Sequence, residues 1–203
     1  MPDEKLFLIT GHPRCGTGYM SALLHSRGFD VGHEEVGQDG ISSWWLAPPD
    51  GVNKYFARRD IPRSALEFDY LVVCTRNPVA AVASIAFTEG ESLDYRKKWV
   101  PEIEAGQSPV EKAVISYVGW YRILLDQGPD LVVQVERAVD PVARFLKGEG
   151  FSPEEPDRYP RKNVNSRPHR DLTVGEIADQ APDRMEDLTR LAERFGYDLS
   201  CPP

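Results

Sequence analysis

The stretch GHPRCGTGYM, which begins at Gly11, combines residue types that are suited to holding an anion. Gly11, Gly16 and Gly18 relieve steric limits on the backbone, so that several N–H groups can converge on one ligand. Arg14 adds a positive charge and Thr17 adds a hydroxyl donor. A short apolar run precedes the stretch and an apolar-periodic segment follows it, which is typical of a strand, a turn and a helix N-terminus. We therefore expect an anion site here and call residues 11–18 the anion loop.

The anion loop lacks two residues that nucleoside triphosphatases use. Their pattern, G-x-x-x-x-G-K-[ST], needs a lysine for the β- and γ-phosphates and a hydroxyl for Mg²⁺. The first two glycines of the loop have this spacing, but Thr17 and Gly18 stand where the lysine and the hydroxyl residue belong. A phosphatase loop is excluded too, because the sixth residue after Cys15 is Ser21 and not arginine. A glycine turn before an ordinary helix is the simpler alternative.

A second candidate anion site lies in the stretch TRNPVAAVASI. Arg76 ends an apolar run, Pro78 occupies the position at which a proline opens a helix, and Ser84 follows eight residues after Arg76. The planar guanidinium of an arginine can bind two phosphate oxygens at once, and a serine two helical turns later can add a hydroxyl. The alternative is that Arg76 is a surface cation and Ser84 a small packing residue.

The anion loop resembles the loop that binds the 5′-phosphosulfate in sulfotransferases that use 3′-phosphoadenosine 5′-phosphosulfate (PAPS). The pattern of that family is roughly P-[KR]-S-G-T-[ST]. The matching positions are Pro13, Arg14, Gly16 and Thr17. Cys15 replaces the usual serine and Gly18 replaces the second hydroxyl residue, so two hydroxyl contacts of the family are missing.

The second stretch resembles the 3′-phosphate element of the same family, R-x-P-x-x-x-x-x-S. The resemblance implies a donor, PAPS, a product, PAP, and no requirement for a metal. It also implies that a late basic loop closes over the nucleotide, and we call residues 157–170 the basic loop. The cofactor-binding residues that it implies are Pro13, Arg14, Cys15, Gly16, Thr17, Gly18, Tyr19, Arg76, Ser84, Arg161, Lys162 and Arg167.

Transfer of a sulfuryl group needs stabilisation of the leaving phosphate and a base for the acceptor proton. Arg14 suits the first task by its place in the anion loop. The sequence VGHEE offers His33, Glu34 and Glu35 at the end of a short strand, and in a parallel sheet this end lies beside the anion loop. Family members carry a glutamate base after the loop helix or a histidine from a nearby region. We favour Glu34 or Glu35 over His33 as the base, with a role in a surface turn as the alternative for each.

Residues 37–64 are rich in turn signals and are expected to form an irregular insertion on the acceptor side. Trp44 and Trp45 could stack on a sugar ring or an aromatic acceptor, or could simply pack against the protein. The polar side chains expected to bind acceptor hydroxyls are Asp39, Ser42 and Ser43. Glu136 matches a family segment near the end of a strand and is expected to be structural.

Strands that alternate with helices must position these residues. The expected strands cover residues 6–10, 29–34, 69–76 and 130–136. The expected helices cover residues 17–27, 109–127, 140–151, 173–180 and 183–196, with one more that starts at Pro78. This order predicts a single α/β domain over residues 1–203, with terminal helices in 173–203, in which ligands bind at the carboxyl ends of parallel strands. The resemblance implies a three-layer sandwich with the P-loop NTPase-like sulfotransferase fold.

Composition narrows the class of protein. The chain has 203 residues, of which 41% are hydrophobic and 28% charged, and a net charge of −8, which argues against a general nucleic-acid binder. No apolar run approaches the ~18 residues of a membrane span, and the N-terminus does not read as a signal peptide. The three cysteines are far apart in the sequence, so we expect reduced thiols in a cytoplasmic protein of open oligomeric state.

We therefore expect a metal-independent sulfotransferase that acts on a small-molecule, glycan or lipid-linked hydroxyl. A divergent P-loop kinase or NTPase is one alternative, which would show Mg²⁺-dependent turnover of ATP. A non-catalytic module that binds PAP or another nucleotide is the other.

Overall fold

The computed structural model describes residues 3–54, 60–90, 92–161 and 167–199. The chain divides into two compact units, one formed by Met1–Thr75 with Leu124–Asn165 and the other by Arg76–Ile123 with Ser166–Pro203. Each unit is described by itself below.

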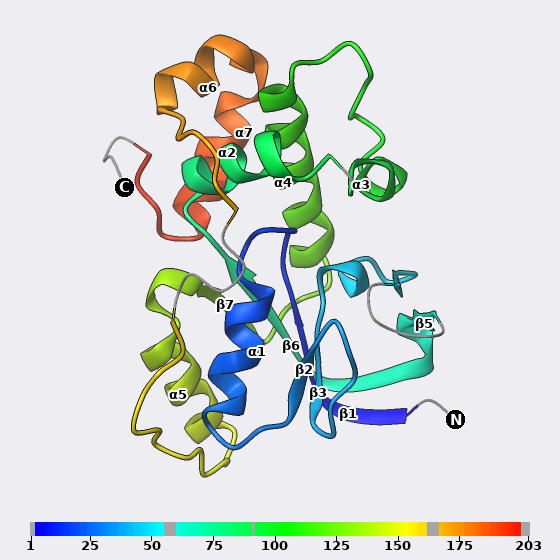
Figure 1. Ribbon diagram of the computed structural model, residues 1–203, viewed down its shortest axis with the longest axis vertical. Coiled ribbons are helices and arrows are strands. Elements are labelled where there is room, and N and C mark those ends of the chain that lie inside the picture. Colours follow the sequence, from blue (N-terminus) through cyan, green and yellow to red (C-terminus); the bar gives the residue numbers. More distant parts are fainter. Residues whose placement is uncertain (1–2, 55–59, 91, 162–166, 200–203) are drawn as a thin grey trace. The chain divides into compact units, whose positions relative to one another are not determined.

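The first unit is built on a parallel sheet of five strands in the order β2-β3-β1-β6-β7 (Figure 1). Its strands are β1 (Asp3–Thr10), β2 (Val31–His33), β3 (Gly40–Ser42), β6 (Leu66–Thr75) and β7 (Leu131–Gln134). A separate antiparallel pair joins β4 (Val52–Asn53) to β5 (Ile61–Pro62). Because all five strands of the sheet are parallel, their carboxyl ends lie at one edge.

Both faces of this sheet are buried, which explains the continuous apolar runs in its strands. Phe7 and Ile9 of β1 face a cluster that includes Met20 from α1 (Thr17–His25) and Leu146 from α5 (Val139–Gly148). Leu8, between them, belongs to a second cluster with Ile41 and Leu46, as alternation along a strand requires. The described part of this unit also contains three short 3₁₀ helices, η1 (Trp44–Leu46), η2 (Arg63–Ala65) and η3 (Val135–Arg137).

The second unit is helical. Its helices are α2 (Pro78–Thr88), α3 (Leu93–Trp99), α4 (Pro109–Leu125, whose last two residues belong to the first unit), α6 (Val174–Gln180), η4 (Pro182–Arg184) and α7 (Met185–Arg194). Tyr117, Trp120 and Tyr121 of α4 are fully buried, and the Tyr121 ring meets Phe195 edge-on at 4.9 Å between centroids. An aromatic layer thus holds α4 against the end of α7.

A buried arginine also ties the second unit together. The Arg96 side chain of α3 donates to the carbonyl of Glu89 at 2.7 Å, to Ser92 Oγ at 3.0 Å and to Ser116 Oγ at 2.9 Å. Burial lowers the pKa of Arg96 to about 10. Because each donor of this guanidinium needs a partner once water is removed, Arg96 fixes α3 between the end of α2 and the middle of α4.

The α/β class and the parallel sheet are confirmed, and the strands expected from the sequence correspond to β1, β2, β6 and β7. The strand β3, inside the segment 37–64 that was expected to be irregular, was missed. It pairs with β1 and separates β1 from β2, the strand that ends at His33. The helix α3 was also missed. The three-layer arrangement and the sulfotransferase fold stay predictions.

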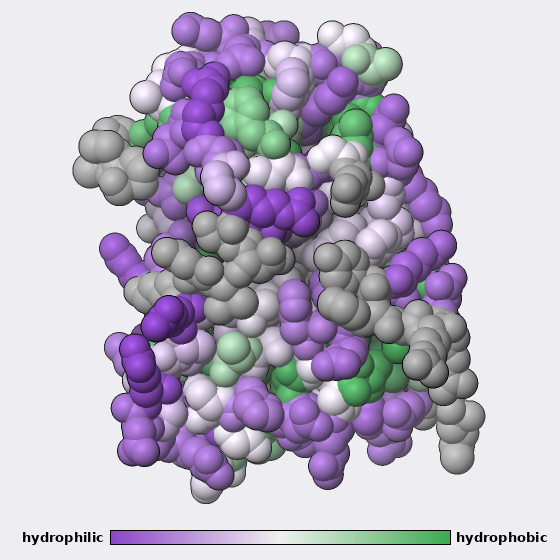
Figure 2. All heavy atoms as spheres, viewed as in Figure 1, coloured by the Kyte–Doolittle hydropathy of each residue, from purple (hydrophilic) through white to green (hydrophobic). Residues whose placement is uncertain are grey.

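The surface drawn in Figure 2 is mainly hydrophilic, with hydrophobic residues in separate patches. Among the described residues, the large hydrophobic side chains that are exposed are Phe87, Val132 and Tyr159, which lie on different segments. In the same part of the chain, no helix has the length and apolar character needed to cross a membrane.

Candidate anion-binding site

The backbone of the anion loop adopts a positive φ at two positions, on either side of Cys15. Arg14 has a φ of 73° and Gly16 a φ of 97°, so both lie in the left-handed region. A non-glycine residue in this region is uncommon and is often found at functional sites. The loop delivers the chain to α1, which starts at Thr17 with no side-chain capping bond and no acidic residue in its first turn.

The N–H groups in the first turn of a helix have no partner inside the helix, and the helix dipole gives them a partial positive charge. At the start of α1 neither a cap nor an acid competes for them. The position of this turn, directly after the carboxyl end of β1, is the usual location of ligands in a parallel sheet. The turn is therefore a good receptor for an anionic group.

Two glycines of the anion loop are required for close packing. A Cβ at Gly11 would lie 2.6 Å from the carbonyl oxygen of Cys74, and one at Gly16 would lie 2.6 Å from Cγ1 of Val135. Gly11 thus lets the loop press on β6, and Gly16 lets it press on η3. The sequence analysis explained these glycines by the freedom that they give the backbone around an anion. The packing contacts are a second reason for glycine at these positions.

The third glycine contacts a predicted site residue. A Cβ at Gly18 would meet Cε1 and Nε2 of His33 at 3.3 Å. His33 Nε2 lies 3.5 Å from Thr17 Oγ1, and Ser42 Oγ donates to the carbonyl of Thr17 at 2.8 Å. The ends of β2 and β3 therefore hold the first turn of α1, and His33 does reach the anion loop although β3 separates its strand from β1.

Glu34 is a buried acid beside this turn. Its side chain is 3% exposed, and its backbone adopts a left-handed conformation with a φ of 59°. Oε2 accepts a hydrogen bond from Ser43 Oγ at 2.5 Å, and the backbone N–H of Trp44 donates to the same carboxyl group. The amide of Asn53 donates to the carbonyl oxygen of Glu34 at 2.7 Å. Sequence reasoning missed Asn53, because nothing local in the sequence marks it as a partner of Glu34.

The electrostatics of Glu34 and His33 favour uncharged forms. Burial raises the pKa of Glu34 to about 7, although the hydrogen bonds from Ser43 and Trp44 oppose this shift. Burial also lowers the pKa of His33, with Glu35 opposing the change. Glu34 Oε1 has no hydrogen-bond partner among the described residues and lies 3.9 Å from His33 Nε2. A carboxyl that titrates near neutrality beside an imidazole is suited to moving a proton.

Other predicted cofactor-binding residues in the anion loop and directly after it are buried. Pro13 and Cys15 are buried, and the Tyr19 side chain belongs to the core cluster on the α1 face of the sheet. Tyr19 can therefore serve an anion only through its backbone N–H. Glu35, the third candidate base, is exposed at the surface.

The second predicted anion element begins where β6 ends. Arg76 directly follows Thr75 and belongs to the second unit, where the Tyr117 hydroxyl donates to the carbonyl oxygen of Arg76 at 2.9 Å. Asn77 caps α2 by accepting from the N–H groups of Val79 and Ala80. Ser84 is 1% exposed. The predicted place of Arg76 between a strand and a helix is thus confirmed, while the contact of Arg76 and Ser84 with a phosphate stays a prediction.

The basic loop gives three candidate closing residues with different surroundings. Arg161 is exposed, whereas Lys162 lies outside the described residues. Arg167 donates to the carbonyl of Thr88 at 2.7 Å and lies 3.4 Å from a carboxyl oxygen of Glu89. In this conformation Arg167 therefore anchors the end of the loop to the end of α2.

The acceptor-side residues are mainly used for internal bonds. Ser42 and Ser43 bind Thr17 and Glu34 as described above, and Asp39 Oδ2 accepts from the N–H of Asp30 at 2.7 Å. The half-buried rings of Trp44 and Trp45 stack on each other at 4.2 Å between centroids, with 28° between their planes. A role for the two rings in binding an acceptor stays a prediction. Glu136 lies on η3, next to Val135, which touches the anion loop.

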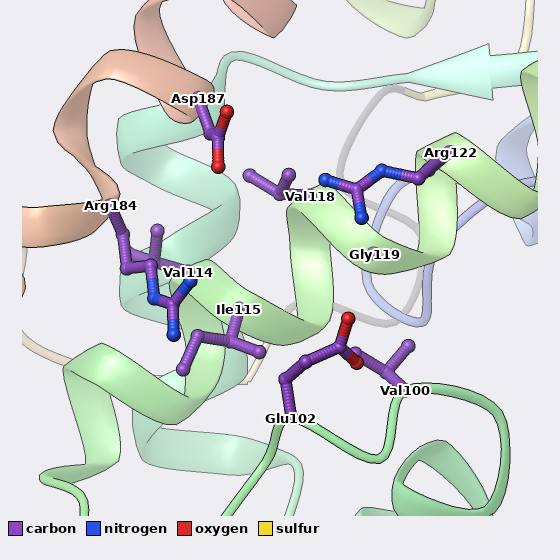
Figure 3. A pocket seen from close by; sticks show the side chains of 9 residues that line it. All are labelled: Val100, Glu102, Val114, Ile115, Val118, Gly119, Arg122, Arg184 and Asp187. Atoms are coloured by element: carbon purple, nitrogen blue, oxygen red, sulfur yellow. The ribbon is translucent and has the colours of Figure 1, made fainter.

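The helical unit contains a small hollow of about 50 Å³, which sequence reasoning did not anticipate (Figure 3). Its apolar wall comes mainly from α4, with Val114 and Val118, and charged side chains stand around it. These charged residues are Glu102, Arg122, Arg184 and Asp187. None of the predicted site residues lines this hollow.

Within the described ranges, no group of three or more His, Cys, Asp and Glu residues is arranged to hold a metal ion. A comparison with protein-family models finds no family that matches the chain, and a comparison with curated proteins finds no match either.

Proposed function

We propose that the protein is a sulfotransferase that moves the sulfuryl group of PAPS to a hydroxyl or amine, on a P-loop NTPase-like sulfotransferase fold. The acceptor would be a small molecule, a glycan or a lipid-linked group. The observation that carries the proposal is the uncapped first turn of α1, which follows a left-handed arginine and lies beside a histidine and a buried glutamate. An anion receptor and a proton acceptor are the two functions that sulfuryl transfer needs in one place.

The anion loop takes the 5′-phosphosulfate in this proposal. The N–H groups in the first turn of α1 and the Thr17 hydroxyl bind its oxygens, and Arg14 stabilises the charge that grows on the leaving phosphate. Arg76 and Ser84 bind the 3′-phosphate, which distinguishes PAPS from ATP. Because Ser84 is buried, its hydroxyl can serve only if the ligand reaches into the start of the helical unit. The basic-loop residues assigned to closing over the nucleotide are Arg161, Lys162 and Arg167.

The base comes from the sequence HEE. The acceptor oxygen forms its bond to sulfur while the bond from sulfur to the phosphate oxygen breaks, and the acceptor proton passes to His33, Glu34 or Glu35. The electron pair of the broken bond leaves with PAP. A group that titrates near neutrality takes this proton most effectively at physiological pH, and Glu34, with a pKa of about 7, meets that requirement.

The alternatives make different predictions about ligands. A P-loop kinase needs the lysine and the Mg²⁺-binding hydroxyl that Thr17 and Gly18 replace. A non-catalytic module would bind PAP and would keep that affinity after His33, Glu34 and Glu35 are all replaced.

Calorimetric titration with PAP, ADP and adenosine 5′-phosphosulfate, each in EDTA, separates these possibilities. We expect PAP to bind at least ~10-fold more tightly than ADP, because a set of charge-assisted contacts to the 3′-phosphate contributes about 1.5–3 kcal/mol. Arg76→Ala should abolish this preference. Arg122→Ala, at an exposed position in the same unit, is the matched control and should retain it. Equal affinity of the wild-type protein for PAP and ADP would overturn the proposal.

A further inference from the structure

We infer that Gly18, His33 and Glu34 act as one unit, in which His33 fills the space above the anion loop that a hydroxyl side chain at residue 18 would take, and Glu34 is its positioning residue. The inference rests on the proposed function, since it names the group that receives the acceptor proton. It assigns to His33 the role that the sequence favoured for Glu34 or Glu35.

The first observation is steric. A Cβ built on Gly18 would lie 3.3 Å from both Cε1 and Nε2 of His33 and 3.6 Å from its Nδ1, so the ring stands against the glycine. Contacts of 3.3 Å are tighter than ordinary van der Waals separation, so a Cβ at position 18 would require the ring to shift by a few tenths of an ångström. The imidazole thus occupies space that a hydroxyl side chain at position 18 would need, which links the glycine to the histidine.

The second observation is a difference in exposure. The His33 side chain is 35% exposed, whereas the side chain of Glu34 is 3% exposed. The carboxyl group of Glu34 also accepts hydrogen bonds from Ser43 Oγ and from the backbone N–H of Trp44. An acceptor molecule can therefore reach His33 and cannot reach the Glu34 carboxyl without moving this shell.

The third observation is the direction of the contacts. His33 Nε2 lies 3.5 Å from Thr17 Oγ1 and 3.9 Å from Glu34 Oε1, and this buried oxygen accepts no hydrogen bond from any residue that the structure describes. Thr17 itself is a predicted ligand of the anion. Nε2 thus faces the loop and the acid, and Nδ1 is the ring nitrogen assigned to the acceptor.

The chemical step follows from this arrangement. As the bond between the acceptor oxygen and sulfur forms and the bond between sulfur and the phosphate oxygen breaks, the acceptor proton passes to Nδ1 and PAP leaves with the electron pair. The resulting imidazolium is stabilised by the carboxylate of Glu34 through Nε2. Glu35 is the other acid that acts on His33, whereas the contacts from α1 and β3, made by Thr17, Gly18 and Ser42, carry no charge.

NMR of the imidazole nitrogens tests the unit without an acceptor, and His33→Ala identifies the His33 signals. Pyrophosphate and PAP, added separately, should each raise the titration midpoint of His33 by at least about 0.5 pH units, because a nearby anion favours the imidazolium. Above about pH 8, where Glu34 is ionised, its carboxylate should favour the neutral tautomer of His33 that carries its proton on Nε2. Glu34→Gln should therefore reduce the fraction of this tautomer, and Glu34→Asp should restore part of it. A merely structural Glu34 would leave the tautomer ratio unchanged, and that result would overturn its positioning role.

A double-mutant cycle tests the packing of Gly18 against His33. Gly18→Ser should weaken PAP binding about 5- to 10-fold in the wild-type protein, because the new side chain displaces the ring. In a His33→Ala background the same change should weaken binding less than 2-fold, since the space is then open. Gly148→Ser, where nothing lies within 4 Å of a new Cβ, is the control. Additive effects would overturn the inference.

The two experiments separate the inference from the proposed function. If His33 responds to pyrophosphate and PAP while PAP binds no better than ADP, the sulfotransferase proposal fails and the unit stands as an anion-sensing arrangement. If PAP binds more tightly than ADP but neither pyrophosphate nor PAP changes the titration midpoint of His33, the proposed function stands and the assignment of His33 fails.

Discussion

The surroundings of Glu34 favour its protonated form, which makes the stability of the fold depend on pH. Its pKa is about 7 in the folded protein, against an ordinary value of 4.5. Between these two values the folded state binds more protons than the unfolded state, so the contribution of Glu34 to stability falls as pH rises from about 4.5 to about 7 and is level above that.

Glu34→Gln removes this dependence because an amide does not ionise. We expect the stability of the variant, relative to wild type, to rise by up to about 3 kcal/mol between pH 4.5 and pH 7.5, as a shift of one pKa unit corresponds to about 1.4 kcal/mol. Urea unfolding at both pH values measures the change. Glu35→Gln, at the exposed neighbouring position, is the control. A difference between Glu34→Gln and wild type that is the same at both pH values would contradict the prediction.

At the scale of elements, one buried arginine connects the end of α1 with the segment that leads into the basic loop. Arg27 is 2% exposed and donates to the carbonyl of Glu154 at 3.3 Å and to the hydroxyl of Tyr159 at 3.0 Å. Its guanidinium also pairs with Glu155 at 3.1 Å and lies over the ring of Tyr159. The segment 154–159 has no helix or strand of its own, so Arg27 is its main anchor within the first unit.

Arg27→Met should release this segment. Loss of a buried guanidinium that carries these bonds is expected to cost about 2–4 kcal/mol of stability, since the carbonyl and carboxyl partners lose their donor. Trypsin should then cleave after Arg158 or Arg161 faster than in the wild type, at a temperature where both proteins are folded. Arg190→Met, which breaks an exposed pair with Glu186, is the control and should change stability by no more than about 0.5 kcal/mol. Equal cleavage rates would rule out the anchoring role.

The elements that the sequence could predict are those whose pattern is local. Three signals can each be recognised within about ten residues of sequence: the apolar run of β1, the proline that opens α2, and the glycine turn before α1. β3 could not be found in this way, because its three residues, Gly40–Ser42, lie among turn-forming residues and are ordered by pairing with β1 and β2.

The site shows the same limit. His33, Glu34 and the anion loop could be named from residue type and order, but their relations could not. The proximity of His33 to Gly18 and the hydrogen bond from Ser43 to Glu34 depend on contacts between segments that are separate in the sequence. Such contacts are set by strand register and burial, which one sequence does not display.

For the molecule as a whole, a net charge of −8 opposes the approach of any highly charged anion. Binding of PAP therefore depends on cations and N–H groups placed close to the ligand. In the proposed function Arg14 acts at the 5′-phosphosulfate and Arg76 at the 3′-phosphate. A nucleotide without the 3′-phosphate would therefore lack the contacts that Arg76 makes.

Hydrogen exchange of backbone amides can test this division in the intact protein. PAP at a concentration well above its dissociation constant should slow exchange in both α1 and the first turn of α2, because each segment must release the ligand to open. Adenosine 5′-phosphosulfate should slow exchange at α1 and leave the start of α2 close to its rate in the free protein. With Arg76→Ala, PAP should behave like adenosine 5′-phosphosulfate. If PAP protected α1 alone in the wild type, or if both nucleotides protected both segments equally, Arg76 would not be the receptor of the 3′-phosphate, and the feature that separates PAPS from other adenosine nucleotides would have no binding group in this chain.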